Sequence, residues 1–292
     1  MNRFKTNMTP YFFIGPSIVL LLIFSFLPII VSFFISFTDM GISGLANWSQ
    51  INFIGISNFV RLFQDPDFIQ AMGNTLFYVV IGVPLAVISS FLIALLLKFV
   101  SDWMSSTFRV IYYMPSITNI VAIAVVWGFL YNQQYGLFNY LLSLADISAV
   151  PWLEDPLIAK ISLIILAVWK SNGVSMLIFL AALQSIPKTH YEAADIDGAN
   201  RWQKLIYITL PSMSFATFFV VVTTLIAWLQ FFEEPFVMTN GGPLNGTTSM
   251  ALFIYQEGFQ YSEFGYGASA SFVLFIVIIL ATFIQFKLRK TD

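Results

Sequence analysis

Long runs without any charged residue constrain this chain more than any other feature of its sequence. The first run, Tyr11–Phe37, exceeds the roughly 20 apolar residues that a helix needs to cross a bilayer. Because 58% of the 292 residues are hydrophobic and only 10% are charged, the chain has too little charge to cover a soluble surface. We therefore predict an all-α membrane protein, a single domain over 1–292. Its six transmembrane helices are expected at about 11–37, 74–97, 110–131, 157–183, 211–232 and 264–286.

The N-terminal run is expected to stay in the protein as a transmembrane helix. A cleavable signal has an apolar core of about 7–15 residues followed by a small-residue cleavage site. This run is about twice as long and lacks such a site. Its Pro16 and Pro28 are expected to kink the helix or to mark its ends.

Positive charge predicts the orientation of these spans. If the N-terminus is cytoplasmic, ten of the thirteen Lys and Arg residues lie inside, while ten of the fifteen acidic residues lie outside. The inside residues are Arg3, Lys5, Lys98, Arg109, Lys188, Arg201, Lys204, Lys287, Arg289 and Lys290. Because this is the positive-inside distribution, we expect both termini and the loop 184–210 to be cytoplasmic.

Composition disfavours several kinds of chemistry. The chain has no cysteine for a disulfide, a thiol nucleophile or an iron–sulfur site, and its single His190 argues against zinc. A membrane enzyme would cluster His, Asp or Glu near the bilayer, and a secondary transporter would show internal symmetry and intramembrane carboxylates. We find no internal repeat and no acid within the expected spans, so both classes are disfavoured.

The polar stretch Glu192–Pro211 stands between two apolar runs of membrane length. Its first residues favour a helix with acids in the first turn, and Gly198 either breaks that helix or admits another backbone. Residues 200–207 can form a second short helix, and Pro211 suits the first turn of the next span. We expect a compact helix–bend–helix projection; the alternative is an ordinary cytoplasmic loop.

The spacing within this stretch resembles the EAA signature of bacterial ABC importer permeases. The signature consists of Glu-Ala-Ala, a glycine six residues after the Glu, nine residues, and then Ile-x-Leu-Pro. Here it is Glu192-Ala193-Ala194, Gly198 and Ile208-Thr209-Leu210-Pro211. The resemblance implies a type I ABC importer permease fold, in which this segment is a coupling helix seated in a cleft of a separate ATP-hydrolysing subunit. The residues implied in ATPase coupling are Glu192, Ala193, Ala194, Asp197, Gly198, Ala199 and Arg201.

The resemblance covers nearly the whole chain and points to the carbohydrate-uptake branch. Supporting stretches are NFVRLFQDPDF at 58–68, Asn74-Thr75, WKSNGVSMLIFLAALQSIP at 169–187, MTNGGP at 238–243 and FGYGASAS at 264–271. They are similar to the first of two dissimilar permeases, the one related to the maltose system's larger membrane subunit, although that subunit's longer periplasmic insertion is missing here. The implied partners are a second permease, an ATP-binding subunit dimer that uses ATP and Mg, and an extracytoplasmic substrate-binding protein. The chain itself is expected to bind no cofactor, metal or nucleic acid and to lie in the bacterial cytoplasmic membrane.

Lys170 is the most unusual residue of the expected spans. It lies about 13 residues, or roughly 20 Å, from the cytoplasmic end of its helix. A charge near the bilayer centre costs about 2.5–3.5 kcal/mol on insertion scales, so Lys170 should face water or a partner. Two interpretations remain open: it bonds a substrate hydroxyl or charge, or it forms a structural pair, for instance with the other permease.

The fifth span carries one polar and aromatic face that suits a sugar ring. Thr224, Ala227, Trp228 and Phe231 follow the i, i+3, i+4, i+7 spacing of a single helix side. The resemblance implies that this face and Lys170, Ser171 and Val174 line the substrate path; the alternative is plain packing. Apolar groups stand where relatives can carry amides, so the substrate is expected to differ from theirs.

Three other features are expected to be structural. Glu233 and Glu234 either meet the substrate-binding protein or mark the membrane edge, which we favour. TNGGPLNGTT lacks the Lys of a phosphate loop and is expected to form a turn. His190 is expected to be a solvated loop residue beside the helix–bend–helix projection. The sequence thus predicts a non-catalytic permease of an ATP-driven importer for a sugar, oligosaccharide or sugar derivative; an importer permease for a non-carbohydrate solute is the alternative.

Overall fold

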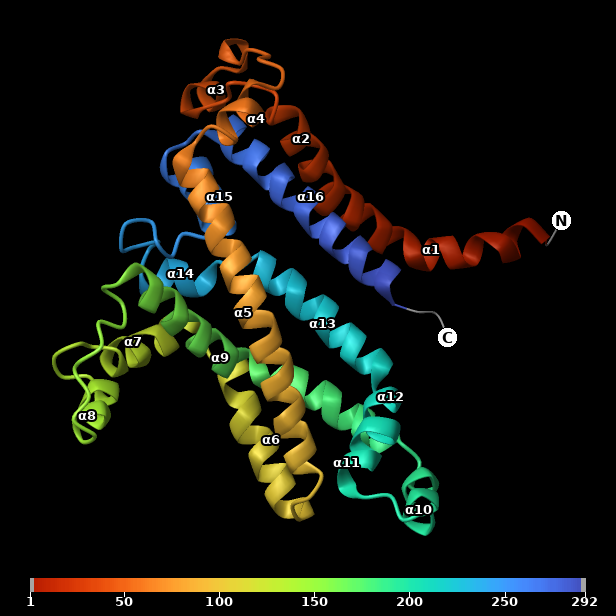
Figure 1. The fold of residues 1–292 in the computed structure, drawn as a ribbon. Helices are drawn as coiled ribbons and strands as arrows, with labels where there is room; N and C mark the ends of the chain where they lie inside the picture. The colour runs from red at the N-terminus through yellow and green to blue at the C-terminus, as the bar shows by residue number, and fades with distance from the viewer. Residues whose placement is uncertain (1–2, 290–292) are drawn as a thin grey trace. The chain divides into compact units, whose positions relative to one another are not determined.

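The computed structural model describes residues 3–289 of the chain. Lys290, one of the ten residues assigned to the inside, lies outside these described residues. The described chain consists of helices, turns and loops, with one isolated antiparallel bridge between Thr38 and Phe53. This agrees with the all-α fold predicted from the apolar runs (Figure 1).

Five helical segments of the described chain are long and apolar enough to cross a membrane. They are Tyr11–Ile35, Pro66–Leu97, Pro156–Ser185, Ser214–Met238 and Phe264–Leu288. A bent pair of helices raises the number to six if it counts as one span. Each segment overlaps one expected run, because the length of an apolar stretch is set directly by bilayer thickness.

The interval 110–131 was expected to be one helix, and this prediction was wrong. It contains the end of α6 (Asp102–Ile117) and all of α7 (Ile120–Leu130), which meet at 100°. Thr118 and Asn119 are extended, and the Asn119 side chain accepts a 2.8 Å hydrogen bond from the Val121 N–H. An asparagine with this bond begins a new helix, so the chain turns there rather than continuing.

Two wide π-helical turns precede Leu-Pro pairs. Leu22–Phe26 lies between α1 (Arg3–Leu21) and α2 (Leu27–Ile35), just before Pro28. The second, Leu205–Thr209, precedes α12 (Leu210–Ser212) and Pro211. A proline donates no backbone hydrogen bond and its ring collides with the carbonyl four residues earlier, and an extra residue in the preceding turn relieves that crowding.

The fifth span is interrupted near its C-terminal end. Helix α13 covers Ser214–Leu229, three residues leave the helical path, and α14 then covers Glu233–Met238. The candidate span Ser214–Met238 therefore includes Glu233 and Glu234, although the expected span ended at Phe232. The expectation that the spans hold no acidic residue was wrong at this point.

Contacts divide the chain into two compact units. The first combines residues up to Pro66 with Phe253–Phe275. In it, α2 runs beside the first half of α16 (Phe264–Leu288), with the Phe33 and Phe272 rings 5.2 Å apart (Figure 1). The Asn58 side chain of α4 (Ser57–Leu62) donates to the Ser36 and Thr38 carbonyls at 3.0 and 2.8 Å.

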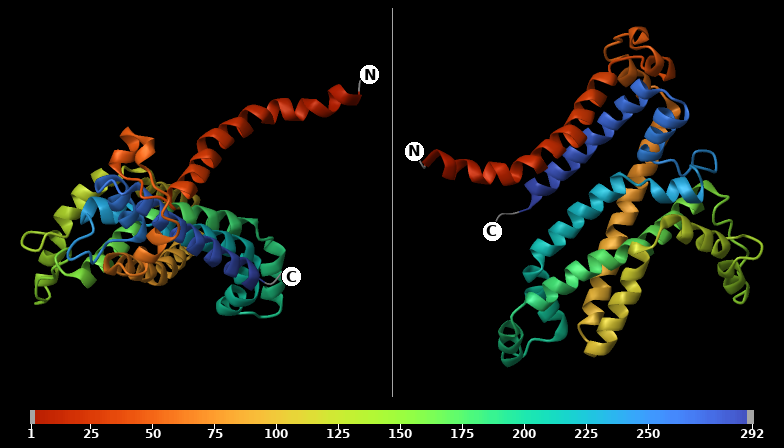
Figure 2. Two further views of the ribbon diagram at one scale, coloured as in Figure 1. Left: turned by 90° about the horizontal axis from the view of Figure 1, so that it is seen from above. Right: turned by 180° about the vertical axis from the view of Figure 1, so that it is seen from behind.

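The second unit, 67–252 with the chain from Ile276 onward, holds both predicted sites. Helix α5 (Pro66–Leu97) packs on α9 (Pro156–Ser185) through a core that includes Ala94, Met176, Phe179, Leu183 and Met213. Helix α6 lies alongside α9, as Figure 1 and the rear view of Figure 2 both show. The interpretation of 1–292 as one domain stays a prediction.

Candidate functional site

The predicted coupling segment is a helix–turn–helix whose backbone closes on itself. Helix α10 (Lys188–Ile196) is followed by a turn at Gly198, which has a positive φ of 74°. The Ala199 N–H donates to the Ala194 carbonyl at 2.8 Å, and the Gly198 N–H donates to the Asp195 carbonyl at 3.1 Å. These two bonds form a Schellman motif, which satisfies the last carbonyls of a helix and places glycine at the left-handed position.

The second helix of the segment, α11 (Arg201–Lys204), begins with a complete capping box. The Asn200 side chain accepts from the Gln203 N–H at 3.0 Å, and the Gln203 side chain accepts from the Asn200 N–H at 2.7 Å. Lys204 forms an ion pair with Asp195 across the turn. Both helix ends at the turn are therefore closed by groups that lie within fifteen residues of one another in the sequence.

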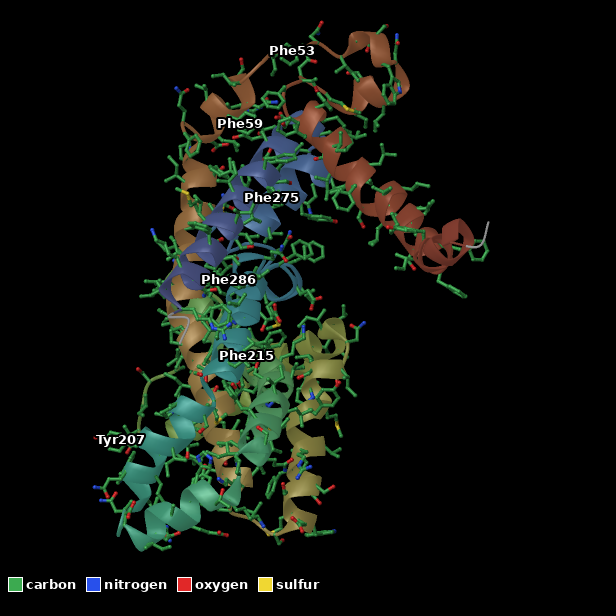
Figure 3. The ribbon with its side chains drawn as sticks, turned by 90° about the vertical axis from the view of Figure 1, so that its right-hand side faces the viewer. Phe53, Phe59, Tyr207, Phe215, Phe275 and Phe286 are labelled. Atoms are coloured by element: carbon green, nitrogen blue, oxygen red, sulfur yellow. The ribbon has the colours of Figure 1, made fainter. Side chains whose placement is uncertain are left out.

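Large apolar side chains of this segment are uncovered. Ile196 is 88% exposed, Trp202 is 72% exposed, and Tyr207, labelled in Figure 3, is 76% exposed. A Cβ atom added at Gly198 would meet nothing within 4 Å. The backbone hydrogen bonds of this turn are satisfied while its large apolar side chains stay exposed. This combination is typical of a surface that binds a partner protein.

The structure brings all seven predicted coupling residues together in this segment. Glu192, Ala193, Asp197, Gly198 and Arg201 are exposed, and Ala194 and Ala199 are half-buried. His190 is exposed as expected, although it lies in α10 rather than in a loop. The assignment of these residues to ATPase coupling remains a prediction.

Two contacts that the sequence reasoning missed join the two ends of this segment and fasten it to the end of α5. The Tyr191 hydroxyl and the Thr209 hydroxyl are 2.9 Å apart, and Thr209 is buried. The Lys98 ammonium, just beyond the end of α5, lies 4.1 Å from the centre of the Tyr191 ring. Tyr191 immediately precedes Glu-Ala-Ala, and its position beside the signature was the only available signal.

The seven residues predicted to line the substrate path surround one cavity of about 500 Å³. Helix α9 contributes Lys170, Ser171 and Val174, while the fifth span contributes Thr224, Ala227, Trp228 and Phe231. Residues that the sequence reasoning did not place there complete the lining: Ser116, Ala167, Ser175, Thr223, Gln230, Phe232, Glu233 and Glu234. The geometry thus joins the two predicted faces, and their role in substrate passage stays a prediction.

Lys170 pairs with two carboxylates of its own chain. Its Nζ lies 2.6 Å from Glu233 Oε2 and 3.3 Å from Glu234 Oε1. The structural alternative had suggested the other permease as the partner, but these acids lie 63 and 64 residues further along the chain. The interruption after α13 is what turns both carboxylates towards α9. An opposite charge offsets part of the cost of placing an ammonium group in the membrane.

The aromatic rings of the cavity are mostly covered. Trp228 and Phe231 stack at 5.0 Å and are only 4% and 6% exposed. The Trp228 ring also occupies the space beside Gly82, where an added Cβ would lie 2.1 Å from it. The expected open aromatic face for a sugar is therefore largely used in packing. Exposed polar groups, namely Ser171, Thr223 and Gln230, line the open side.

The segment 239–249 forms a turn, as the missing phosphate-loop Lys suggested. The Thr247 hydroxyl is buried and bonds to the Gly242 carbonyl at 2.8 Å. The Tyr78 hydroxyl donates to the Thr247 carbonyl at 3.0 Å, and Asn74 donates to the Asn245 and Thr248 carbonyls at 3.0 and 2.9 Å. Side chains of α5 therefore bind this turn, which we name the outer turn because it is predicted to lie on the outer side of the membrane.

These features define a membrane transport subunit. It has a helix–turn–helix whose backbone is hydrogen-bonded and whose apolar side chains are exposed, and it has a cavity lined by α9 and the fifth span. The chain belongs to the family described as "Binding-protein-dependent transport system inner membrane component", which matches residues 68–290. It is 33% identical to "Probable ABC transporter permease protein YurN" of Bacillus subtilis (strain 168), over 98% of both chains. It is 32% identical to "Lactose transport system permease protein LacF" of Rhizobium radiobacter, over 96% of this chain and 93% of that one.

A solved structure shares the fold over nearly the full length. It is described as a bacterial ABC transporter involved in the import of the acidic polysaccharide alginate, and the TM-score is 0.81 at 25% identity. The likeness covers 99% of this chain and 100% of that chain. The type I importer permease fold and the family that the sequence resembled are thereby confirmed.

Proposed function

We propose that this chain is the membrane-spanning subunit of an ATP-driven importer for a sugar, an oligosaccharide or a sugar derivative. It belongs to a family of transport components, and relatives such as LacF are named for sugar transport. The observation that carries the proposal is the coupling segment, whose closed backbone presents exposed apolar side chains beside the signature residues. The chain performs no catalysis itself.

The proposed assembly has four kinds of component. An ATPase dimer, which holds ATP and Mg, binds the coupling segment on the cytoplasmic side of the bacterial membrane. A substrate-binding protein delivers the solute from the other side, in keeping with the description of the family. A second, dissimilar permease completes the path. Both termini of this chain are cytoplasmic, as the distribution of positive charge favours.

Transport then follows a two-state scheme. Closure of the ATPase dimer moves the coupling segment, and α9 and α13, which flank it, change the access of the cavity between the two sides. ATP and loaded binding protein each favour one of the two states, as alternating access requires. The cavity residues of α9 and of the fifth span contact the passing solute.

Position 198 allows a sharp test of the coupling segment. Gly198→Ala and Gly198→Trp impose the same positive-φ strain, which disfavours any residue with a Cβ. They differ in bulk, and that bulk meets nothing within this chain. In the reconstituted importer, we expect Gly198→Trp to lose sugar uptake and sugar-stimulated ATPase activity while Gly198→Ala retains most of both.

Membrane insertion and thermal stability of the two variants serve as controls, because both should insert equally. Equal uptake by the two variants would contradict docking of a partner at Gly198. Uptake that persists without the ATPase partner and follows an ion gradient would instead favour a secondary transporter. Uptake of no sugar by an otherwise active importer would favour a non-carbohydrate solute.

A further inference from the structure

The cavity has an uneven charge balance. Its ionisable lining residues are Lys170, Glu233 and Glu234, and the remaining lining residues carry no ionisable group. One ammonium and two carboxylates leave a formal charge of −1. Both carboxylates already contact the single ammonium, at 2.6 and 3.3 Å.

The three groups differ in their access to the cavity. The Lys170 and Glu234 side chains are only 17% and 9% exposed, whereas the Glu233 side chain is 57% exposed. Of the three charged groups, the Glu233 side chain is therefore the most accessible to a solute in the cavity. Lys170 is also anchored through its backbone, because its carbonyl accepts a 2.6 Å hydrogen bond from the Ser116 hydroxyl.

An ionised carboxylate only accepts hydrogen bonds, and charge-assisted bonds to it are stronger than neutral ones. Sugar hydroxyls are donors that suit such a group. A carboxylate or sulfonate on a sugar would face the excess negative charge instead. The Lys170 ammonium has a third N–H donor, but an anion that approached it would also lie against the two carboxylates already 2.6 and 3.3 Å from that nitrogen, and such a like-charge contact is costly.

We propose that this cavity selects uncharged sugars and excludes anionic ones, with Glu233 as the residue that contacts sugar hydroxyls. Lys170 is a positioning residue, which holds the carboxylate and is not itself a binding site for anions. The inference rests on the proposed function and deepens it, because membership of the family leaves the charge of the sugar open.

The test compares two sugars in the complete reconstituted importer. The first is a neutral oligosaccharide that the wild type transports, and the second is the same oligosaccharide oxidised to a carboxylate at one C6 position. The quantity measured is the ratio of the two uptake rates, each at saturating loaded binding protein. The binding protein is the same in every sample, so its own preference cancels when a variant is compared with the wild type.

We expect the wild type to transport the neutral sugar well and the carboxylated sugar poorly. Glu233→Gln keeps the side-chain size and removes the excess charge, so the uptake ratio should shift towards the carboxylated sugar by roughly ten-fold, because like charges in a contact are costly. Glu233→Ala should shift the ratio in the same direction and lower uptake of the neutral sugar. Lys170→Arg keeps the charge and should preserve the wild-type ratio.

The matched control is Glu154→Gln, an identical change at an exposed acid outside the cavity lining. It should leave the ratio unchanged. If Glu233→Gln and Glu154→Gln give the same ratio, or if the wild type carries both sugars equally, the inference is wrong while the proposed function stands. If the wild type carries no sugar at all, the proposed function itself fails.

Discussion

The coupling segment and the outer turn are both polar interruptions between apolar helices, but they differ in how their backbone hydrogen bonds are satisfied and in whether their side chains are buried. In the outer turn, Thr247, Thr248 and Ser249 are buried, and side chains from α5 bond its carbonyls. In the coupling segment, local bonds close the backbone, whereas Trp202 and Ile196 stay exposed. The polar groups of the outer turn are thus satisfied by contacts within the same chain.

The difference shows how one chain separates stability from docking. A buried turn with satisfied carbonyls contributes to folding, and losing its partners leaves unpaired polar groups. A self-capped projection needs no tertiary contact to keep its shape, so its side chains are free for another protein. Substitutions at the two places should therefore fail in different assays.

The largest expected effect on stability follows from Asn74→Ala. The Asn74 amide is buried, donates to two carbonyls of the outer turn and accepts from Lys160 Nζ at 3.1 Å. Its loss leaves buried groups unpaired at about 1–3 kcal/mol each, so we expect the free energy of unfolding to fall by about 2–4 kcal/mol. Chemical unfolding in detergent micelles, followed by tryptophan fluorescence, measures this change.

Gln70→Ala is the matched control, because its side chain is also an amide of α5 and makes an exposed 3.0 Å bond to the Leu244 carbonyl of the outer turn. It should cost no more than about 0.5 kcal/mol, as surface substitutions usually do. Equal losses in the two variants would mean that the outer turn does not depend on Asn74, and the contrast with the coupling segment would disappear.

Asn74 also illustrates what sequence could and could not supply. The pair Asn74-Thr75 marked the family resemblance without any assigned role. Several partners of this pair are more than 170 residues away, namely the Asn245 and Thr248 carbonyls and the Met250 N–H. Hydrophobic length predicted the spans because it follows from bilayer thickness, but no single-sequence pattern reports contacts over such separations.

The same limit explains the errors within the predicted spans. The sequence did contain a local signal for the bend at Asn119, because asparagine is a helix-capping residue and it lies inside an apolar run. We predicted one continuous helix because we gave more weight to hydropathy than to this residue. The burial of the Trp228 ring depends on the space beside Gly82, which lies 146 residues earlier in the chain. Helical spacing cannot reveal a contact over this separation. Spacing did predict which side chains share the cavity, because each helix face is determined locally.

An intermediate effect, on coupling alone, is expected from Trp202→Ala. Trp202 is 72% exposed, so the free energy of unfolding should change by no more than about 0.5 kcal/mol. Exposed tryptophans often carry much of the binding energy of an interface, so sugar-stimulated ATPase activity should fall roughly ten-fold. Trp48→Ala, at a 76% exposed residue of the other unit, should alter neither quantity.

If Trp202→Ala lowered stability as much as Asn74→Ala does, the coupling segment would contribute to folding as the outer turn does. Unchanged ATPase stimulation would remove Trp202 from the docking surface. Both measurements are needed, because only their combination distinguishes a docking residue from a folding residue.

The smallest effect is expected at a bond within the coupling segment, between the Tyr191 and Thr209 hydroxyls. Tyr191→Phe removes this bond and keeps the ring beside the Lys98 ammonium. Thr209→Val removes it from the other side, together with a 3.2 Å bond to the Lys204 carbonyl. Each change should lower the free energy of unfolding by about 1 kcal/mol, and the double variant should cost little more than Thr209→Val alone.

This bond also connects α10 to the π-helical turn that leads into the fifth span, so its loss should affect how efficiently ATP hydrolysis drives uptake. We expect ATPase stimulation to persist while the number of sugars imported per ATP falls about two- to five-fold, in proportion to a coupling of about 1 kcal/mol. Parallel uptake and phosphate-release assays on the reconstituted importer give this ratio. A double variant whose stability loss equals the sum of the single losses would show that the two hydroxyls do not act together, and the segment would then move independently of Thr209.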